Sequence, residues 1–323
     1  MRNQVIRGGV LVIALAGWPA APGFAQDAKA TEILAATRDA VGNKKLDGMK
    51  SLTLQAKMQR NSGNFRAETE VEMLLEMPDK YLRSDTIGGG IGVMTTGFNG
   101  DKAIMPAGMR MAPGGGGMVM TMTMGGGATP HTAEGEKPTP EQLAQMNEAS
   151  LRNYRTEISR FMLGWFGMAH PSLKAQYTYV GEAESPDGKA YVIDVKDADG
   201  FAARLFVDQN SKLPLMVTYQ GRQPRMITSG SGPGMTRVTG SAGGGTVTMT
   251  PEQAQQRLEE LKKSAAEAPT VEFSLFFEDW KEVDGINFPH TIRRASAGQT
   301  NEEWAITKVK VNPKIDPKKF EVK

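Results

Sequence analysis

The sequence predicts a mainly β fold with helices, built on a single curved antiparallel sheet. The first observation is a two-residue hydrophobic period in many short segments, such as residues 51–58 and 70–77, which is typical of strands with one buried and one solvated face. The second is a set of tight turns between such segments, including Asp199-Gly200 and Asp284-Gly285, which favour hairpins. About nine short strands joined in this way favour one strongly curved sheet.

The expected elements follow each other along the chain. Residues 31–41 carry apolar side chains on one stripe and end near Gly42-Asn43, which predicts a short helix. The two-residue period then predicts extended segments over residues 51–58, 70–77, 80–83, 177–181, 191–195, 204–207, 215–219, 271–277, 288–294 and 302–311.

Two stretches rich in glycine and methionine interrupt the strands. Residues 88–127 contain 14 Gly and 8 Met, and residues 221–250 contain 8 Gly and 3 Met. We therefore expect one domain over residues 26–323, with Gly/Met-rich inserts at 88–138 and 221–250.

Each insert is followed by a predicted helix with the same opening, Thr-Pro-Glu-Gln, at residues 139–142 and 250–253. Threonine as N-cap, proline at the first helical position and an acid in the first turn are typical of helix starts. In the first helix, apolar residues recur at three- and four-residue steps and widen into an apolar end at residues 158–168. We expect this end to cover the apolar face of the sheet as a plug. The second helix is mostly polar, which predicts a surface position.

The first 25 residues are predicted to be a secretory signal peptide. Arg2 and Arg7 precede an apolar run at residues 10–16, and small residues precede Gln26, so cleavage is expected after Ala25. The run is too short to span a bilayer. We therefore expect a soluble, exported protein in a periplasm.

Composition excludes several classes of protein. The chain has 38 basic and 36 acidic residues, and loss of the two signal arginines leaves 36 of each. A net charge near zero with mixed signs argues against nucleic-acid binding. The chain contains no Cys, which excludes disulfides, thiolate zinc sites and a cysteine nucleophile.

The sequence carries no recognisable catalytic motif. Its three histidines, His131, His170 and His290, are far apart, and H-E-x-x-H, G-x-S-x-G and the P-loop pattern are absent. We therefore expect no catalysis and no cofactor. A hydrolase remains an alternative without a motif behind it.

Methionine forms the one cluster of residues with its own chemistry. Met118, Met120, Met122 and Met124 alternate along the chain, and strand spacing would place all four on one face. Thioethers select Cu(I), so a copper-binding protein is the alternative function. The same alternation is also typical of an adaptable apolar surface, since methionine is flexible and polarisable, or of an insert without order.

Several motifs resemble the outer-membrane lipoprotein carrier (LolA-like) superfamily. They are residues 277–289 (FEDWKEVDGINFP), 306–316 (ITKVKVNPKID) with Phe320, 76–83 (EMPDKYLR), 98–101 (FNGD), and 205–208 (LFVD) with Leu213-Pro214. They are spread between residues 76 and 320, in the order that the family has. Each motif is weak by itself, and the ordered set carries the resemblance.

The resemblance implies an incomplete antiparallel barrel wrapped around helices, whose concave apolar face holds acyl chains. It thereby implies a periplasmic binding or carrier protein for a lipid or an acylated lipoprotein, with membrane-associated transport components as further partners. We expect it to act as a monomer. Many carriers of this family have Arg before the proline of the strand–Pro–strand step, where this chain has Met77, and the two inserts exceed the compact carrier. Both departures favour general apolar-ligand binding over strict lipoprotein sorting.

The residues expected to contact an acyl chain come from the apolar sides of three strands and from the plug. They are Leu54, Met58, Met73, Leu75, Ile158, Phe161, Met162, Trp165, Phe166, Phe273 and Leu275.

Overall fold

The computed structural model describes most of the mature chain. The described residues are 27–62, 65–87, 92–106, 118–123, 139–185, 188–222, 225–232, 235–240, 247–249, 253, 256 and 270–321. The expected signal peptide and, apart from Gln253 and Gln256, the second predicted helix lie outside these residues.

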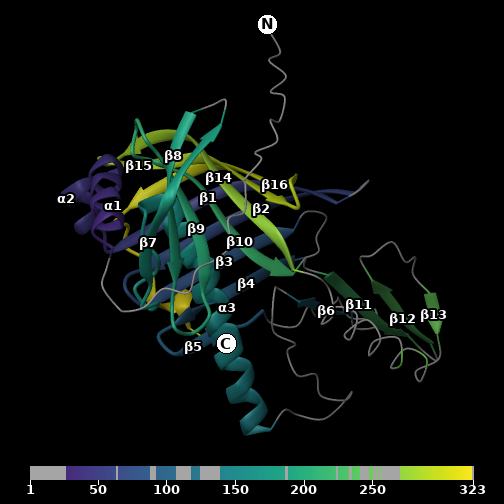
Figure 1. Cartoon of the computed structure of the whole chain (residues 1–323). Helices are drawn as coiled ribbons and strands as arrows, with labels where there is room; N and C mark the ends of the chain where they lie inside the picture. Colours follow the sequence, from purple (N-terminus) through teal and green to yellow (C-terminus); the bar gives the residue numbers. More distant parts are fainter. Residues whose placement is uncertain are drawn as a thin grey trace, which may run out of the picture.

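Twelve of the described strands form one sheet that bends around a long helix (Figure 1). The order across the sheet is β5-β4-β3-β2-β1-β16-β15-β14-β10-β9-β8-β7, so β5 and β7 are its edges. The bounds are β1 (Ser51–Ser62), β2 (Phe65–Glu76), β3 (Lys80–Ile87), β4 (Gly92–Asn99), β5 (Lys102–Ile104), β7 (Gln176–Ser185), β8 (Gly188–Lys196), β9 (Ala202–Asp208), β10 (Pro214–Arg222), β14 (Thr270–Val283), β15 (Ile286–Ser296) and β16 (Gln299–Val311). Every neighbouring pair is antiparallel. The predicted class, a mainly β fold with one open, curved antiparallel sheet around helices, is confirmed.

The helices begin and end where local chemistry allows. The helix α3 (Pro140–Phe166) starts at Thr139, whose hydroxyl accepts from Gln142 N while the Gln142 side chain accepts from Thr139 N, and it stops at Gly167, whose φ of 68° is left-handed. The N-terminal helix α1 (Ala28–Val41) begins three residues earlier than expected because Asp27 caps it. A short helix α2 (Asn43–Asp47) and a 3-10 turn η1 (Pro317–Phe320) complete the set of described helices.

The strands β4 and β5 lie within residues 88–138, the range expected for the first insert, and yet they continue the main sheet. The two-residue hydrophobic period that would indicate these strands is weak, because glycine stands where an alternating side chain would be. At Gly97 a Cβ would lie 2.0 Å from the backbone oxygen of Tyr81, so close pairing with β3 requires glycine.

The remaining described strands come from the two inserts and pair with each other. They are β6 (Met118–Thr123), β11 (Arg225–Gly232), β12 (Met235–Gly240) and β13 (Val247–Met249), in the order β13-β12-β11-β6. In this register Met122 lies opposite Met226. Segments that are 100 residues apart in the chain thus form one small sheet.

The principal core lies between the concave face of the main sheet and α3. Close packing reaches the helix backbone itself at Gly164, where a Cβ would lie 1.9 Å from the ring of Phe277. Phe277 is buried and has no room to retreat, so glycine sets how closely α3 approaches β14.

We predict that Gly164→Ala destabilises the protein by about 1–3 kcal/mol, the cost of overpacking, although alanine is the better helix former by about 0.5–1 kcal/mol. The measurement is the free energy of unfolding in urea. Gly48→Ala is the control, because its Cβ would meet its nearest neighbour at 3.6 Å, and it should leave stability within about 0.5 kcal/mol of wild type. A wild-type stability for Gly164→Ala would refute this account of the helix–sheet contact.

Candidate binding site on the concave face

The structure brings all eleven predicted apolar site residues together. Leu54 and Met58 lie on β1, Met73 and Leu75 on β2, and Phe273 and Leu275 on β14. The other five lie on α3. All eleven belong to one hydrophobic cluster, and none is more than 5% exposed. Their contact with a ligand stays a prediction, since the helix occupies the space beside the strands.

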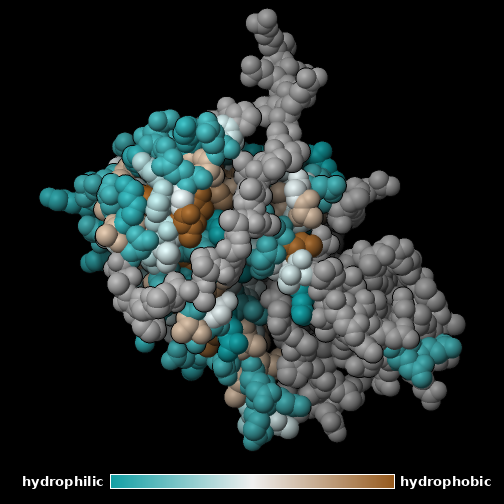
Figure 2. Space-filling model, viewed as in Figure 1, coloured by the Kyte–Doolittle hydropathy of each residue, from teal (hydrophilic) through white to brown (hydrophobic). Residues whose placement is uncertain are grey.

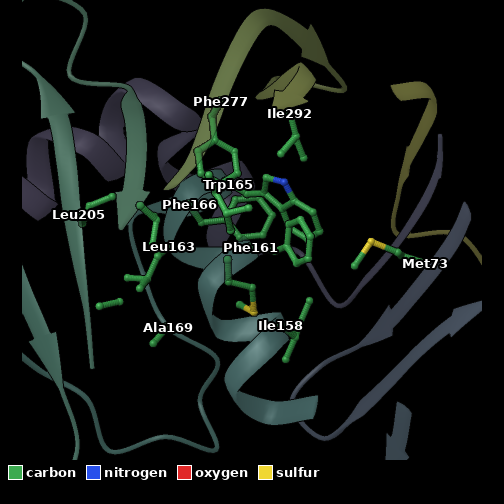
Figure 3. Close-up of a cluster of buried hydrophobic side chains, with 14 of the residues drawn as sticks. Met73, Ile158, Phe161, Leu163, Trp165, Phe166, Ala169, Leu205, Phe277 and Ile292 are labelled. Atoms are coloured by element: carbon green, nitrogen blue, oxygen red, sulfur yellow. The ribbon is translucent and has the colours of Figure 1, made fainter. Parts of the chain in front are cut away.

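The C-terminal part of α3 fills the concave face with aromatic rings (Figure 3). Phe161 stacks on Trp165 with ring centroids 5.4 Å apart and lies 5.3 Å from the ring of Trp304 on β16. Phe166 meets Phe288 on β15 edge to face at 5.6 Å. We call residues 158–166 the plug, because they cover an apolar face that would otherwise contact water.

The outer surface of the molecule is different in character. The face drawn in Figure 2 is mostly hydrophilic in its described part, with small scattered apolar patches. The large hydrophobic side chains exposed among the described residues are Val93, Met105, Leu143, Val180 and Leu215. A pocket of about 310 Å³ lies on the convex side of β1, β2 and β16, and its lining residues are mostly polar, including Lys308 and Lys319, with Leu74, Pro313 and Ile315 among them. The extended apolar surface of the described residues is the one that the plug covers.

A set of charged side chains lies at the N-terminal end of the plug, between the sheet and α3. We call it the charged belt: Arg60, Arg83, Asp85, Glu157, Arg160, Arg294 and Glu302. Three of its members are buried, namely Arg83, Asp85 and Glu302. Such groups are rarely buried without partners.

Arg83 is the most fully paired member of the belt. Its guanidinium contacts Asp85 Oδ1 at 2.8 Å and Glu157 Oε1 at 2.6 Å. It also lies 4.8 Å above the ring of Trp304. Burial lowers the pKa of Arg83. The neighbouring carboxylates of Asp85 and Glu157 raise it by more, so the pKa lies well above its ordinary value. Arg83 thus ties β3 to α3 as a fixed cation.

Glu302 on β16 is buried among cations. It accepts from Arg60 at 2.8 Å and from the indole of Trp304 at 2.6 Å. Burial raises the pKa of Glu302, but Arg294, Arg60, Arg83 and the Trp304 hydrogen bond together lower it, to about 2.

The third part of the belt is built around the ring of Tyr219 on β10. The guanidinium of Arg160 lies 3.6 Å above that ring, and Arg294 Nη2 donates to Tyr219 Oη at 2.7 Å. Burial and the neighbouring Arg294 lower the pKa of Arg160. The Nε atoms of both arginines are buried and have no hydrogen-bond partner among the described residues.

The apolar side chains of this face were expected from the sequence, and the charged belt was not. A signal was present, because Arg60, Arg294 and Glu302 stand at inward positions of the two-residue period of their strands, in register with one another. A charge at an inward position interrupts the alternation and indicates a partner on another element.

The methionine alternative is only partly described. Met118, Met120 and Met122 lie on β6, whose spacing puts them on one face, whereas Met124 lies outside the described residues. The described residues contain no group of three or more His, Cys, Asp or Glu that could hold a metal ion. No described helix is long and apolar enough to cross a membrane.

Comparisons with known proteins gave matches only at the level of structure. No protein-family model and no curated protein matches the chain. A LolA superfamily protein from Nitrosomonas europaea is similar with a TM-score of 0.45 and 9% identity, over 90% of this chain and 97% of that one. A DUF1329 family protein from Desulfovibrio piger is similar with a TM-score of 0.46 and 10% identity, over 90% of this chain and 97% of that one. A proposed outer membrane lipoprotein-sorting protein domain from Vibrio parahaemolyticus is similar with a TM-score of 0.39 and 8% identity, over 90% of this chain and 96% of that one.

We predict that Glu302 makes stability fall in acid. Its pKa is about 2 in the folded protein and 4.5 ordinarily, so between about pH 5 and pH 2 only the unfolded chain takes up this proton. The stabilisation is therefore complete above pH 5 and lost as the pH falls, by about 3 kcal/mol.

The test compares Glu302→Gln with wild type by urea unfolding from pH 7 to pH 2.5. The variant should be less stable at pH 7, and the difference should shrink towards zero in acid. Glu303→Gln, on the exposed side of the same strand, should follow the wild-type curve. A constant difference at every pH would contradict the assigned pKa.

Proposed function

We propose that the protein is a periplasmic, non-catalytic binding or carrier protein for acyl chains, which lie between the concave face of the sheet and α3. The observation that carries the proposal is the plug: an apolar face built from several strands is covered by a helical segment that presents Phe161, Trp165 and Phe166 to it together with aliphatic side chains. The ligand is a lipid or an acylated lipoprotein. Membrane-associated transport components would deliver and receive it.

Energetics support exchange between the plug and a ligand. Burial of a C16 chain yields about 0.8 kcal/mol per CH₂, or on the order of 10 kcal/mol in total. A bound chain would replace plug side chains at the same strand residues, so the sheet keeps an apolar partner in both states. The cost of opening is then the partial solvation of Phe161, Met162 and Trp165, each worth about 2–3 kcal/mol when fully buried.

The sequence resemblance supports the same function, since it implies acyl-chain binding on a concave apolar face. The signal peptide expected at residues 1–25 supports a periplasmic location. The absence of a catalytic motif from the sequence favours binding over catalysis.

The experiment that tests the proposal is native mass spectrometry of the mature protein, purified from periplasm without detergent. An adduct of several hundred daltons or more that detergent removes would support the carrier function and define the class of cargo. A bare mass, together with failure to bind any added amphiphile, would contradict it.

Copper(I) binding is the second candidate, favoured by one observation. The small sheet pairs β6 with β11 so that Met122 lies opposite Met226, and methionines of both inserts are thereby brought into one register. The same spectra would show an adduct of about 63 Da, as expected for one copper ion, which replacement of Met118, Met120, Met122 and Met124 would abolish. Persistence of that adduct in the replaced protein would exclude this site.

We predict that Phe161→Ala strengthens acyl-chain binding, because the ligand no longer has to displace this ring. The probe is a monoacylglycerol with a C16 chain, titrated by tryptophan fluorescence, and affinity should rise about tenfold, the equivalent of about 1.4 kcal/mol. Trp165→Ala should act in the same direction. Both variants also lose core packing, so stability is measured in parallel.

Phe320→Ala is the control for lost stability. Phe320 is fully buried in a separate cluster with Leu74 and Leu82, and its loss should lower stability by about 3–5 kcal/mol without changing affinity. If Phe161→Ala lowers stability and leaves affinity unchanged, the plug is ordinary core and does not exchange.

A further inference from the structure

The charged belt has more positively charged side chains than negatively charged ones. Its cations are Arg60, Arg83, Arg160 and Arg294, and its acids are Asp85, Glu157 and Glu302. Glu157 is hydrogen-bonded to Arg83, and Glu302 is hydrogen-bonded to Arg60 and Trp304. Arg160 and Arg294 form no ion pair with any carboxylate of the described residues.

These two guanidiniums are also held close together. Both contact Tyr219, Arg160 at the face of its ring and Arg294 at its hydroxyl. Both Nε atoms are buried without a hydrogen-bond partner. Like charges at short range and unsatisfied buried donors each cost free energy. An anion bound between the two guanidiniums would offset the repulsion between them.

Both side chains keep partial contact with solvent. Arg160 and Arg294 are half-buried as residues, so an anion could approach their exposed atoms. A planar guanidinium presents parallel N–H donors that match the oxygens of a carboxylate or a phosphate. Contacts with Tyr219 hold both guanidiniums in place before a ligand binds.

The pair lies directly beside the proposed acyl-chain site. Arg160 precedes Phe161 on α3, and it is five residues from Trp165, about 7.5 Å along the helix axis. On the strands, Arg294 is two residues from Ile292 and Tyr219 is two residues from Val217, and both of these apolar neighbours are fully buried. An anionic group at the arginines would therefore continue into a chain along the apolar face.

We propose that Arg160, Arg294 and Tyr219 form a head-group site for the anionic group, phosphate or carboxylate, of an acyl-chain ligand. The inference rests on the proposed function and adds the charge class of its ligand. Because Arg160 lies on α3, binding of the head group acts on the same helix that carries the plug.

The test compares three C12 amphiphiles below their critical micelle concentrations: dodecyl phosphate, neutral monododecanoyl glycerol and dodecyltrimethylammonium. The readout is the ratio of dissociation constants within each protein variant, so a general loss of folding cancels. Wild type should bind dodecyl phosphate at least about tenfold more tightly than the neutral amphiphile, as expected for charge-assisted hydrogen bonds, and it should bind the cation most weakly.

Substitutions of single arginines test which residues cause the preference for dodecyl phosphate over the neutral amphiphile. Arg160→Gln and Arg294→Gln should each reduce it to about twofold or less while neutral binding persists, and Arg294→Lys should keep part of it because the charge remains. Arg293→Gln is the matched control: Arg293 neighbours Arg294 on β15, points to the opposite face and pairs with Glu278. It should retain the full preference.

The outcomes separate the two proposals. Equal binding of phosphate and neutral amphiphiles by wild type, or a preference that survives in the Arg160→Gln/Arg294→Gln variant, would overturn the head-group site and leave acyl-chain binding in place. Inorganic phosphate that binds as tightly as dodecyl phosphate would make it a site for free anions and overturn its assignment to an amphiphile. Failure of all three amphiphiles to bind would overturn both proposals.

Discussion

The structure depends on one constraint: a single curved sheet has a large apolar face that must not contact water. A β-sandwich solves this with a second sheet, and this chain solves it mainly with α3, while α1 packs into the same core through Ala30, Ile33 and Val41. The strands β1 and β16 meet in the middle of the sheet, so the concave face is assembled from both ends of the chain. The contact of Gly164 with Phe277 shows how completely α3 has been fitted to it.

The same constraint explains where the charges lie. The plug is apolar apart from Ser159 and Arg160, and α3 extends beyond it towards its polar start at Thr139. Where the helix leaves the concave face, guanidiniums rather than apolar side chains lie over the aromatic rings at inward strand positions, as Arg83 does over Trp304. Ionic groups occupy these positions, and most of them satisfy one another through Arg83, Glu157 and Glu302. The Arg160–Tyr219–Arg294 group is the part of this boundary that remains open to a further partner.

The fold class, the long helix and the burial of the eleven apolar residues in one cluster could be predicted because each leaves a local signal. The two-residue period marks the strands, Thr139-Pro140 marks the helix start, and the apolar residues after Ile158 mark the plug. The strand β4 could not be predicted, since its glycine at 97 is required by close pairing with Tyr81 on another strand. The belt was missed for the same physical reason: whether an inward arginine is tolerated depends on carboxylates and rings that are distant in sequence. Pairing of the inserts through β6 and β11 is likewise a long-range property.

A cover that belongs to the chain itself has a defined consequence for binding. Under the proposed function, the plug competes with a ligand as an intramolecular group, so the apparent affinity is reduced by the fraction of molecules in which the face is covered. Only a ligand that buries a long apolar chain, at about 0.8 kcal/mol per CH₂, recovers that loss. An empty protein then keeps its apolar face out of water, where an open one would invite association. A head-group site on the plug helix would add selectivity to this arrangement, because the charge that recognises the ligand and the rings that it displaces lie on successive residues, Arg160 and Phe161.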